Sequence, residues 1–179
     1  QLLASVIPNC ISYDPAFSYE LAVIVQDGLR RMFGEKENIY YYITVMNENY
    51  VHPPMPEGAK AGILKGLYLL KKARRARKAT PRVRLIGSGT ILNEALAAGE
   101  LLMRDYGVQS DIWSVTSFNE LTRDGRAASR HNRHHPEGPA KNAYVTQCLE
   151  NDDAPVIAAT DYVHSYADQI REFVPARYV

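Results

Sequence analysis

Short runs of β-branched and aromatic residues alternate along this chain with longer segments of helical periodicity. Such alternation is typical of an α/β architecture. In the first part, Val6–Ser12 predicts the end of a buried strand, because Pro15 restricts the residue before it to extended geometry. Residues 19–33 predict a helix that Gly34 ends, and Ile39–Met46 predicts a second buried strand. The apolar face of that helix carries Leu21, Ile24, Val25, Leu29 and Met32.

The helix over residues 19–33 has a recognisable start. Ser18 is the expected N-cap, and Glu20 suits the first helical turn, where a negative charge interacts favourably with the helix dipole. A Pro-rich loop follows the second strand, and Glu57–Leu70 then returns to a helical pattern. These features predict a strand–helix–strand–loop–helix order for the first 70 residues.

A second strand–helix–strand unit begins near residue 83. Its strands are predicted at Val83–Ile86 and Ile112–Val115, and its helix at Ile91–Tyr106 with Thr90 as N-cap and Gly107 as the stop. Further along, the pattern predicts a short helix through Leu121 capped by Thr116 or Ser117, a polar loop over 123–142, a strand over 154–159 and a helix over 164–173.

Residues 71–84 differ from both units, because they carry eight Lys or Arg and no acid. With Pro81 inside the run and a new strand after it, the segment predicts a connection between two lobes. The simplest interpretation is a solvated linker. A phosphate-rich or acidic protein partner is the alternative, although no aromatic residue is interleaved for base stacking.

Composition excludes several classes of protein. The chain has 179 residues, 21 Lys or Arg against 20 Asp or Glu, and 46% hydrophobic residues. This balance argues against a disordered tail and against a generic nucleic-acid binder, and no apolar run approaches the about 20 residues that span a bilayer. Cys10 and Cys148 are too few for a disulfide framework or a four-cysteine zinc site. They predict reduced, mostly buried thiols in a cytosolic, and therefore cytoplasmic, protein.

Gly87–Thr90 lies between a predicted strand and a predicted helix, where backbone amides can bind an anion. The dinucleotide fingerprint needs a third glycine where Leu92 stands, and no P-loop Lys follows. A structural turn is the favoured interpretation, and a small anion is the alternative.

Three histidines, His131, His134 and His135, lie within five residues beside Arg130 and Arg133. Two His spaced by three could share a helical face and hold a metal ion, but the neighbouring Asn, Pro and Gly residues favour a loop. We therefore expect a solvated His/Arg loop and no metal site.

Asn47, Glu48, Asn49 and Tyr50 follow the predicted second strand, and His52 comes shortly after them. Ligands of α/β proteins collect beyond the carboxyl ends of strands. Glu48 could act as an acid or base and His52 as a proton shuttle. The alternative is a Pro-stiffened loop whose polar side chains satisfy their own backbone. Residues 12–15 end the first strand in a comparable place, and either line the same cleft or form a simple turn.

Several strings resemble one enzyme family. They are VIPNCISYDPAF at 6–17, YYYITVMNENY at 40–50, LIGSG at 85–89, WSVTSF at 113–118 and ATDY at 159–162. They resemble the homodimeric bacterial pyruvate dehydrogenases, the thiamine-diphosphate-dependent, decarboxylating first component of the pyruvate dehydrogenase complex. The resemblance runs over nearly the whole chain.

The resemblance implies an α/β fold made of parts of two transketolase-like domains. Residues 1–57 would end the pyrimidine-binding domain, 58–81 would form a helix and the basic connection, and 82–179 would begin the C-terminal domain. Tyr13 and residues 47–50 match family strings and would support the cofactor cleft or the dimer interface. The cofactors would be thiamine diphosphate and Mg²⁺, and the partners a second copy of the chain and the lipoyl-bearing dihydrolipoamide acetyltransferase. We expect no nucleic-acid or membrane partner.

The family's Gly-Asp-Gly motif for diphosphate and magnesium does not occur in this chain, so no catalytic residue is carried over. The catalytic residues would lie before Gln1, and the absence of an initiator Met suggests that the chain was cut from a longer protein. Two alternatives stay open: another transketolase-like thiamine-diphosphate enzyme, and a non-catalytic interaction fragment that uses the basic and His-rich segments.

Overall fold

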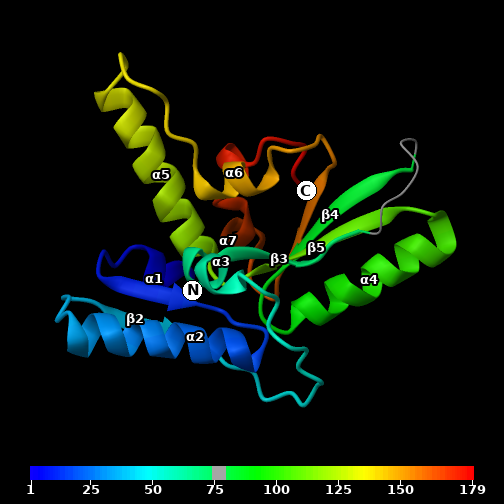
Figure 1. Cartoon of the computed structure of the whole chain (residues 1–179), viewed down its shortest axis with the longest axis horizontal. Coiled ribbons are helices and arrows are strands. Elements are labelled where there is room, and N and C mark those ends of the chain that lie inside the picture. Colours follow the sequence, from blue (N-terminus) through cyan, green and yellow to red (C-terminus); the bar gives the residue numbers. More distant parts are fainter. Residues whose placement is uncertain (74–79) are drawn as a thin grey trace.

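The computed structural model describes residues 1–73 and 80–179, which form two sheets (Figure 1). The first has two parallel strands, β1 (Cys10–Tyr13) and β2 (Tyr40–Ile43). The second has the order β3-β5-β4-β6, with β3 (Leu67–Lys71), β5 (Gln109–Val115), β4 (Arg82–Gly87) and β6 (Val156–Ala159). β3 is antiparallel to β5, and the other neighbours are parallel.

The first sheet is built around a crossover helix, which a parallel strand pair requires. A short helix, α1 (Leu2–Ser5), precedes β1. Helix α2 (Ser18–Leu29) and a π-helical turn, η1 (Arg30–Gly34), join β1 to β2, and α3 (Ala59–Lys65) follows the Pro-rich loop. The core between these elements includes Ile11, Ile24 and Ile63. The predicted helix over 19–33 is therefore present, but Phe17 and not Ser18 is its N-cap.

Helices cover both faces of the second sheet. Helix α4 (Ile91–Tyr106) packs on one face, where Leu85 and Ile112 point. The opposite face, which includes Ile86 and Val115, is covered by α5 (Phe118–His134), α6 (Tyr144–Leu149), α7 (His164–Asp168) and the 3-10 turn η2 (Arg171–Phe173). Leu85 and Ile86 are consecutive in β4 and serve different faces, as the two-residue period of a strand requires.

The predicted boundaries hold well around α4. It begins after Thr90 and ends at Gly107, whose φ of +65° is the left-handed conformation that a glycine C-cap adopts. β5 and β6 lie where strands were predicted, whereas the predicted helix over 164–173 is divided between α7 and η2.

Three predictions in the first part were wrong. The strand expected over Val6–Ser12 begins only at Cys10. The helix expected over Glu57–Leu70 ends at Gly66, which has φ +99°, and Leu67–Lys71 forms β3 instead. Finally, β2 is not buried, because Tyr40 and Tyr42 are 43% and 44% exposed. Within the described ranges β2 pairs only with β1, so its outer edge is unpaired.

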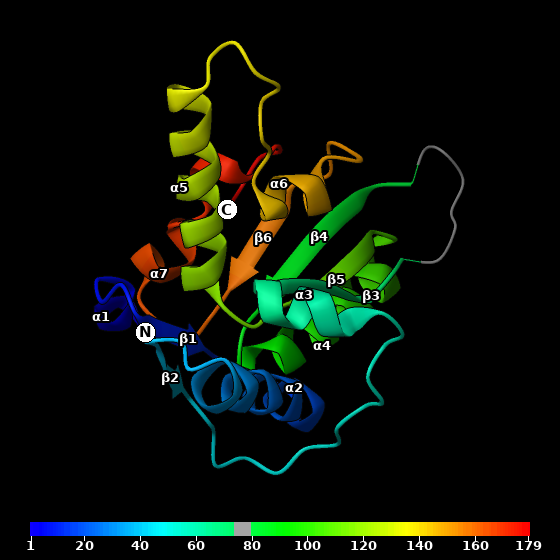
Figure 2. The ribbon, with the colours of Figure 1, turned by 60° about the vertical axis from the view of Figure 1, so that its left-hand side comes forward.

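Helix α5 differs most from expectation. Ser117 caps it as predicted, accepting a hydrogen bond from the Glu120 amide at 3.0 Å, but the helix continues to His134 instead of becoming a loop after Leu121. Its buried residues stop at Gly125, where an added Cβ would lie 2.4 Å from the Phe173 ring. The far half of α5 extends beyond the sheet (Figure 2).

The prediction of a solvated linker over residues 71–84 was also partly wrong. Its interior, residues 74–79, lies outside the described residues, but its ends belong to β3 and β4. Arg84 is buried and pairs with Asp152, while also donating to the Leu149 carbonyl at 2.7 Å. Arg82 pairs with Asp111 at 2.8 Å. These two arginines therefore hold β4 to neighbouring segments and are not part of a solvated linker.

Cys10 is buried and Cys148 is half-buried, and both are free thiols, as predicted. Among the helices in the described ranges, none combines the length and the apolar character needed to cross a membrane.

Candidate functional site

The carboxyl ends of three parallel strands meet where the two sheets adjoin. Asp14 follows β1, the Ser88–Gly89 turn follows β4, and Thr160 follows β6. Backbone hydrogen bonds hold Asp14 in this region: its amide donates at 2.7 Å to the carbonyl of Thr116, which follows β5, and its carbonyl accepts from the Gly89 amide at 3.1 Å. This is the position at which α/β proteins place their ligands.

The carboxyl group of Asp14 is the centre of this junction. Its residue is 4% exposed. Oδ1 accepts hydrogen bonds from Thr44 Oγ1 at 2.6 Å and from the Tyr162 hydroxyl at 3.3 Å, so one carboxyl group joins the segment after β2 to the segment after β6. Ser88 Oγ and Thr160 Oγ1 lie 3.0 Å apart beside it.

Burial raises the pKa of Asp14, and hydrogen bonds from Thr44, Ser88 and Tyr162 oppose that rise. The nearby charge of Asp161 raises this pKa further. Because the donors are hydroxyls, they can also accept a hydrogen bond when the carboxyl group is protonated. The junction can therefore hold Asp14 in either protonation state, but its burial leaves little room for direct contact with a substrate.

The Gly87–Thr90 turn does not need an external anion. The Ser88 and Gly89 amides already donate to the carbonyls of Ala159 and Asp14. Gly89 has φ +53°, and an added Cβ would lie 2.9 Å from Asp14 Oδ2. The group beside this turn is therefore the protein's own carboxyl, which favours the structural interpretation of the turn over the small-anion alternative.

The residues singled out from the sequence are only partly brought together. Tyr13 is 2% exposed, and its hydroxyl donates to the Leu64 carbonyl at 2.7 Å, so it lies in the core rather than in an open cleft. Asn47, Glu48 and Asn49 are exposed. Tyr50 turns back to the body, where its hydroxyl donates to the Ala16 carbonyl.

His52 holds the same loop against α2. Its Nδ1 accepts a hydrogen bond from the Ser18 amide at 2.9 Å, and its ring stacks on Tyr50 with the centroids 4.9 Å apart. An acceptor Nδ1 is a neutral imidazole nitrogen, so in this geometry any proton that His52 carries is on Nε2. Tyr50 and His52 thus act as anchors of the Pro-rich loop, and Glu48 lies on its exposed part.

Glu20 is a second buried carboxylate, whose role sequence reasoning missed. It is completely buried, and Oε2 accepts from the amides of Ala16 and Phe17 at 2.5 and 3.0 Å. Oε1 accepts from the hydroxyls of Tyr68 in β3 and Ser114 in β5, at 2.7 and 2.6 Å. Burial raises its pKa, and these four donors oppose the rise. The available signal was an acidic residue in a first helical turn, which pointed to a helix start and not to a link between the sheets.

The His cluster lies on the last turn of α5 and just after it, and not in a loop. The rings of His131 and His135 have centroids 4.5 Å apart, while His134 ends the helix. Slight burial, Lys141 and His135 lower the pKa of His131. In the described part of the chain, no group of three or more His, Cys, Asp or Glu side chains is placed to hold a metal ion.

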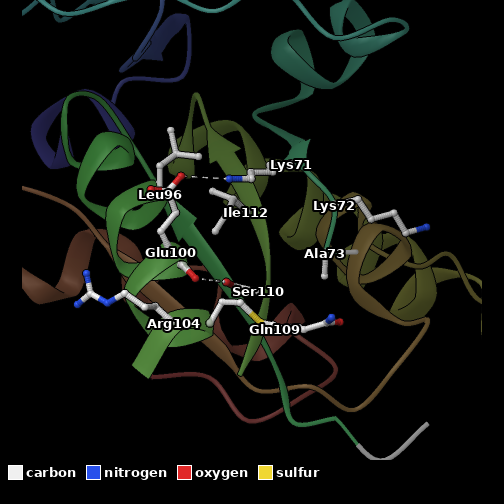
Figure 3. Close-up of a pocket in the computed structure, with 11 residues that line it drawn as sticks. Lys71, Lys72, Ala73, Leu96, Glu100, Arg104, Gln109, Ser110 and Ile112 are labelled. Atoms are coloured by element: carbon white, nitrogen blue, oxygen red, sulfur yellow. Dashed lines mark hydrogen bonds and ion pairs between the residues drawn. The ribbon is translucent and has the colours of Figure 1, made fainter. Parts of the chain in front are cut away.

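Two cavities lie away from the Asp14 junction. The larger, about 410 Å³, has an apolar floor that includes Leu96 and Ile112, with Lys71 paired to Glu100 at its edge (Figure 3). It opens near Gln109 at the amino end of β5, which is opposite to the end where α/β ligands bind. The second, about 380 Å³, lies among α3, α5 and α6.

Family comparisons divide the chain into two parts. Residues 1–53 match the family model described as the pyruvate dehydrogenase E1 component middle domain. Residues 66–177 match the model described as the transketolase-like TK C-terminal domain.

Curated relatives of this chain are pyruvate dehydrogenase E1 components. The pyruvate dehydrogenase E1 component of Pseudomonas aeruginosa is 55% identical over 98% of this chain, and that of Escherichia coli K12 is 53% identical over 95%. The chain spans only 20% and 19% of the lengths of these relatives.

Solved structures show the fold. The transketolase of Campylobacter jejuni aligns with 99% of this chain and 23% of its own length, at a TM-score of 0.59 and 13% identity. A transketolase mutant from Pichia stipitis aligns with 88% of this chain and 19% of its own length, at a TM-score of 0.54 and 14% identity. The predicted α/β fold with parts of two transketolase-like domains is confirmed.

Proposed function

The chain belongs to the family of transketolase-like C-terminal domains through residues 66–177, and from this premise we propose that it is a portion of a pyruvate dehydrogenase first component. The whole enzyme, an oxidoreductase, decarboxylates pyruvate on thiamine diphosphate. It then passes the two-carbon unit to a lipoyl group of the dihydrolipoamide acetyltransferase, whose disulfide is reduced as the acetyl thioester forms. The proposal includes a homodimer, Mg²⁺ as the metal ion and a cytoplasmic location.

One observation carries this proposal: the 55% identity extends over 98% of the chain and crosses both family segments. The 13–14% identity to transketolases supports a shared fold. It carries no argument about the substrate. The domain boundaries 1–57, 58–81 and 82–179 remain a proposal from the sequence. The family matches end at residue 53 and resume at residue 66, ahead of the proposed start at residue 82.

The residues of this chain do not by themselves fit the cofactor. The amides of Ser88 and Gly89 are used internally, and the described residues present no carboxylate cluster for Mg²⁺. We propose that the contribution of this chain is architectural. Tyr13, Asn47, Glu48, Asn49 and Tyr50 support the cofactor cleft or the dimer interface of the whole enzyme, through the core in the case of Tyr13 and through the anchored loop for the others.

The decisive experiment uses the full-length protein that contains this chain. We expect thiamine-dependent release of CO₂ from pyruvate and reductive acetylation of a lipoyl domain, with no transfer between sugar phosphates. Turnover of sugar phosphates without turnover of pyruvate would instead support another transketolase-like enzyme. The isolated 179-residue chain is expected to be inactive, and micromolar binding of thiamine diphosphate to it in a calorimetric titration would contradict that expectation.

A further inference from the structure

The far half of α5 and the loop after it, residues 126–142, form a basic projection that we call the α5 tip. It contains Arg126, Arg130, Arg133 and Lys141 against a single acid, Glu137, so its charge with neutral histidines is 4 − 1 = +3. The whole chain has a net charge of +1. The α5 tip therefore concentrates positive charge that the rest of the chain balances.

The charge of the α5 tip is not neutralised within the described ranges. The acids of α5 lie in its first half, where Glu120 pairs with Arg123 at 2.9 Å and Asp124 accepts a hydrogen bond from the Tyr144 amide. No ion pair within 4.0 Å joins an arginine of the tip to an acid in the part of the chain that the structure describes.

The arginines form one stripe. Arg126, Arg130 and Arg133 have the i, i+4, i+7 spacing that places side chains on one helical face, over a length of about 10 Å. All three are exposed. Of the five residues between them, Ala127 is also exposed, and Ala128, Ser129, His131 and Asn132 are half-buried. Both views show the tip beyond the packed body of the molecule (Figures 1 and 2).

The loop after α5 is held against the helix before any partner arrives. Asn132 makes two hydrogen bonds with Lys141: its Nδ2 donates to the Lys141 carbonyl at 3.0 Å, and its Oδ1 accepts from the Lys141 amide at 2.8 Å. These bonds fix the returning loop against the helix. A preorganised surface loses less conformational entropy on binding than a flexible one.

Helix stability alone does not account for this arrangement. Cations in the last turn interact favourably with the helix dipole, which explains Arg133 and His134. The dipole effect fades within one turn, so it does not explain Arg126 or Arg130, and like charges at i, i+4 destabilise a helix.

A nucleic acid is a poor match for the α5 tip. Residues 126–142 contain no Phe, Tyr or Trp on which an unpaired base could stack. Carboxylates on a protein surface need no stacking platform, because they can pair with the guanidinium groups along the side of the helix.

We propose that the α5 tip is a docking surface for an acidic face of a partner protein, with the stripe of Arg126, Arg130 and Arg133 pairing with its carboxylates. The identity of the partner rests on the proposed function, which makes the lipoyl-bearing acyltransferase the first candidate. Docking through exposed charges depends steeply on ionic strength and acts mainly on the rate of association.

The test compares two triple variants of the full-length protein. Arg126→Glu, Arg130→Glu and Arg133→Glu together reverse the stripe. Lys36→Glu, Lys60→Glu and Arg104→Glu make the same charge change at exposed positions elsewhere. A third variant with glutamine at the three stripe positions guards against misfolding. The probes are the purified acyltransferase, poly-L-glutamate and a 20-base-pair DNA duplex, each at 50 and 200 mM salt.

We expect the stripe reversal to weaken binding of the acyltransferase and of poly-L-glutamate at least tenfold at 50 mM salt. The control triple should bind both probes within twofold of the unmodified protein, and the glutamine triple should have an intermediate affinity. The difference in affinity between the stripe reversal and the control triple should be smaller at 200 mM salt. Decarboxylation of pyruvate with an artificial electron acceptor should be unchanged in all variants. Equal binding by the stripe and control variants overturns the inference, as does tighter binding of the duplex than of poly-L-glutamate.

Failure of the proposed function would look different. If the unmodified protein does not decarboxylate pyruvate, the enzymatic proposal falls, and the docking inference is then judged on poly-L-glutamate by the same tenfold criterion. If pyruvate turnover is normal and the stripe reversal binds both probes normally, only the docking inference falls.

Discussion

Asp14 and Glu20 lie six positions apart, and both are buried carboxylates that join the first sheet to the second, but the protein satisfies them differently. Glu20 accepts two backbone amides and two hydroxyls. Asp14 accepts hydroxyls, from Thr44 and Tyr162. A backbone amide can only donate and cannot turn away, whereas a hydroxyl can rotate and accept. The Glu20 site therefore needs a side chain with a hydrogen-bond acceptor. At the Asp14 site the hydroxyls can rotate to donate to, or accept from, the side chain at position 14.

The largest effect is expected from Glu20→Ala, which leaves the amides of Ala16 and Phe17 buried without an acceptor. We expect a loss of about 4 kcal/mol in the free energy of unfolding, measured by urea denaturation. Glu20→Gln keeps a carbonyl oxygen for the two amides and should cost only about 1 kcal/mol. Exposed Glu48→Ala is the control and should stay within about 0.5 kcal/mol. Equal losses for the Ala and Gln variants would show that the charge, and not the acceptor, matters at this site.

Asp14→Ala should lower the free energy of unfolding by about 2 kcal/mol, less than Glu20→Ala does. The reason is that Thr44 and Tyr162 can redirect their hydroxyls toward each other. Their oxygens already lie 3.3 Å apart. Asp14→Asn should cost less than about 1 kcal/mol, since an amide group can donate to the same hydroxyl oxygens. The same denaturation measurement decides, and a loss for Asp14→Ala equal to that for Glu20→Ala would remove the distinction between the two sites.

Gly89→Ala tests how closely the Asp14 carboxyl is held. The new Cβ would lie 2.9 Å from Oδ2, and the residue would keep φ +53°, so we expect a loss of about 1.5 kcal/mol. In an Asp14→Ala background the contact disappears and only the conformational cost of about 1 kcal/mol remains. A double-mutant cycle measures this coupling. If the losses of the Gly89→Ala and Asp14→Ala variants simply add in the double variant, the Asp14 carboxyl moves aside freely when a Cβ is added at position 89.

The smallest effect is a pH dependence. Burial raises the pKa of Asp14 above its ordinary value of 3.8, so between these two values the folded protein binds more protons than the unfolded chain. Stability from this group is therefore fully present below pH 3.8 and is lost as pH rises through the raised value. Asp14→Asn should gain stability relative to the unmodified protein over this interval, as measured by urea denaturation across a pH series. A constant difference between the two would show that the pKa of Asp14 is not raised.

Local patterns predicted much of the second sheet. Leu92, Leu96 and Met103 follow one side of α4, and Gly107 ends it, so periodicity and a glycine stop were sufficient. The same reasoning failed at Leu67–Lys71, since helical spacing continues through Gly66 and only its left-handed backbone shows the break. It failed again after Leu121, because the second half of α5 has no apolar face to detect.

The buried carboxylates could not be predicted from neighbouring residues. Ser114, which holds Glu20, lies 94 positions away, and Tyr162, which holds Asp14, lies 148 positions away. A glutamate in a first helical turn and an aspartate before a proline each have an adequate local explanation. Their role in joining the sheets exists only once the chain has folded, and the sequence therefore suggested the exposed Glu48 as the acid of interest.

The outer edge of β2, unpaired among the described residues, has a practical consequence for handling the isolated 179-residue chain. Its tyrosines at 40 and 42 are partly exposed, and Val45 and Met46 beyond them are 66% and 50% exposed. An accessible strand edge beside apolar side chains is a template for a strand from another molecule, and hence for aggregation. The Tyr42→Lys variant would place a charge on this edge. We expect concentrated solutions of this variant to become turbid more slowly than those of the unmodified chain.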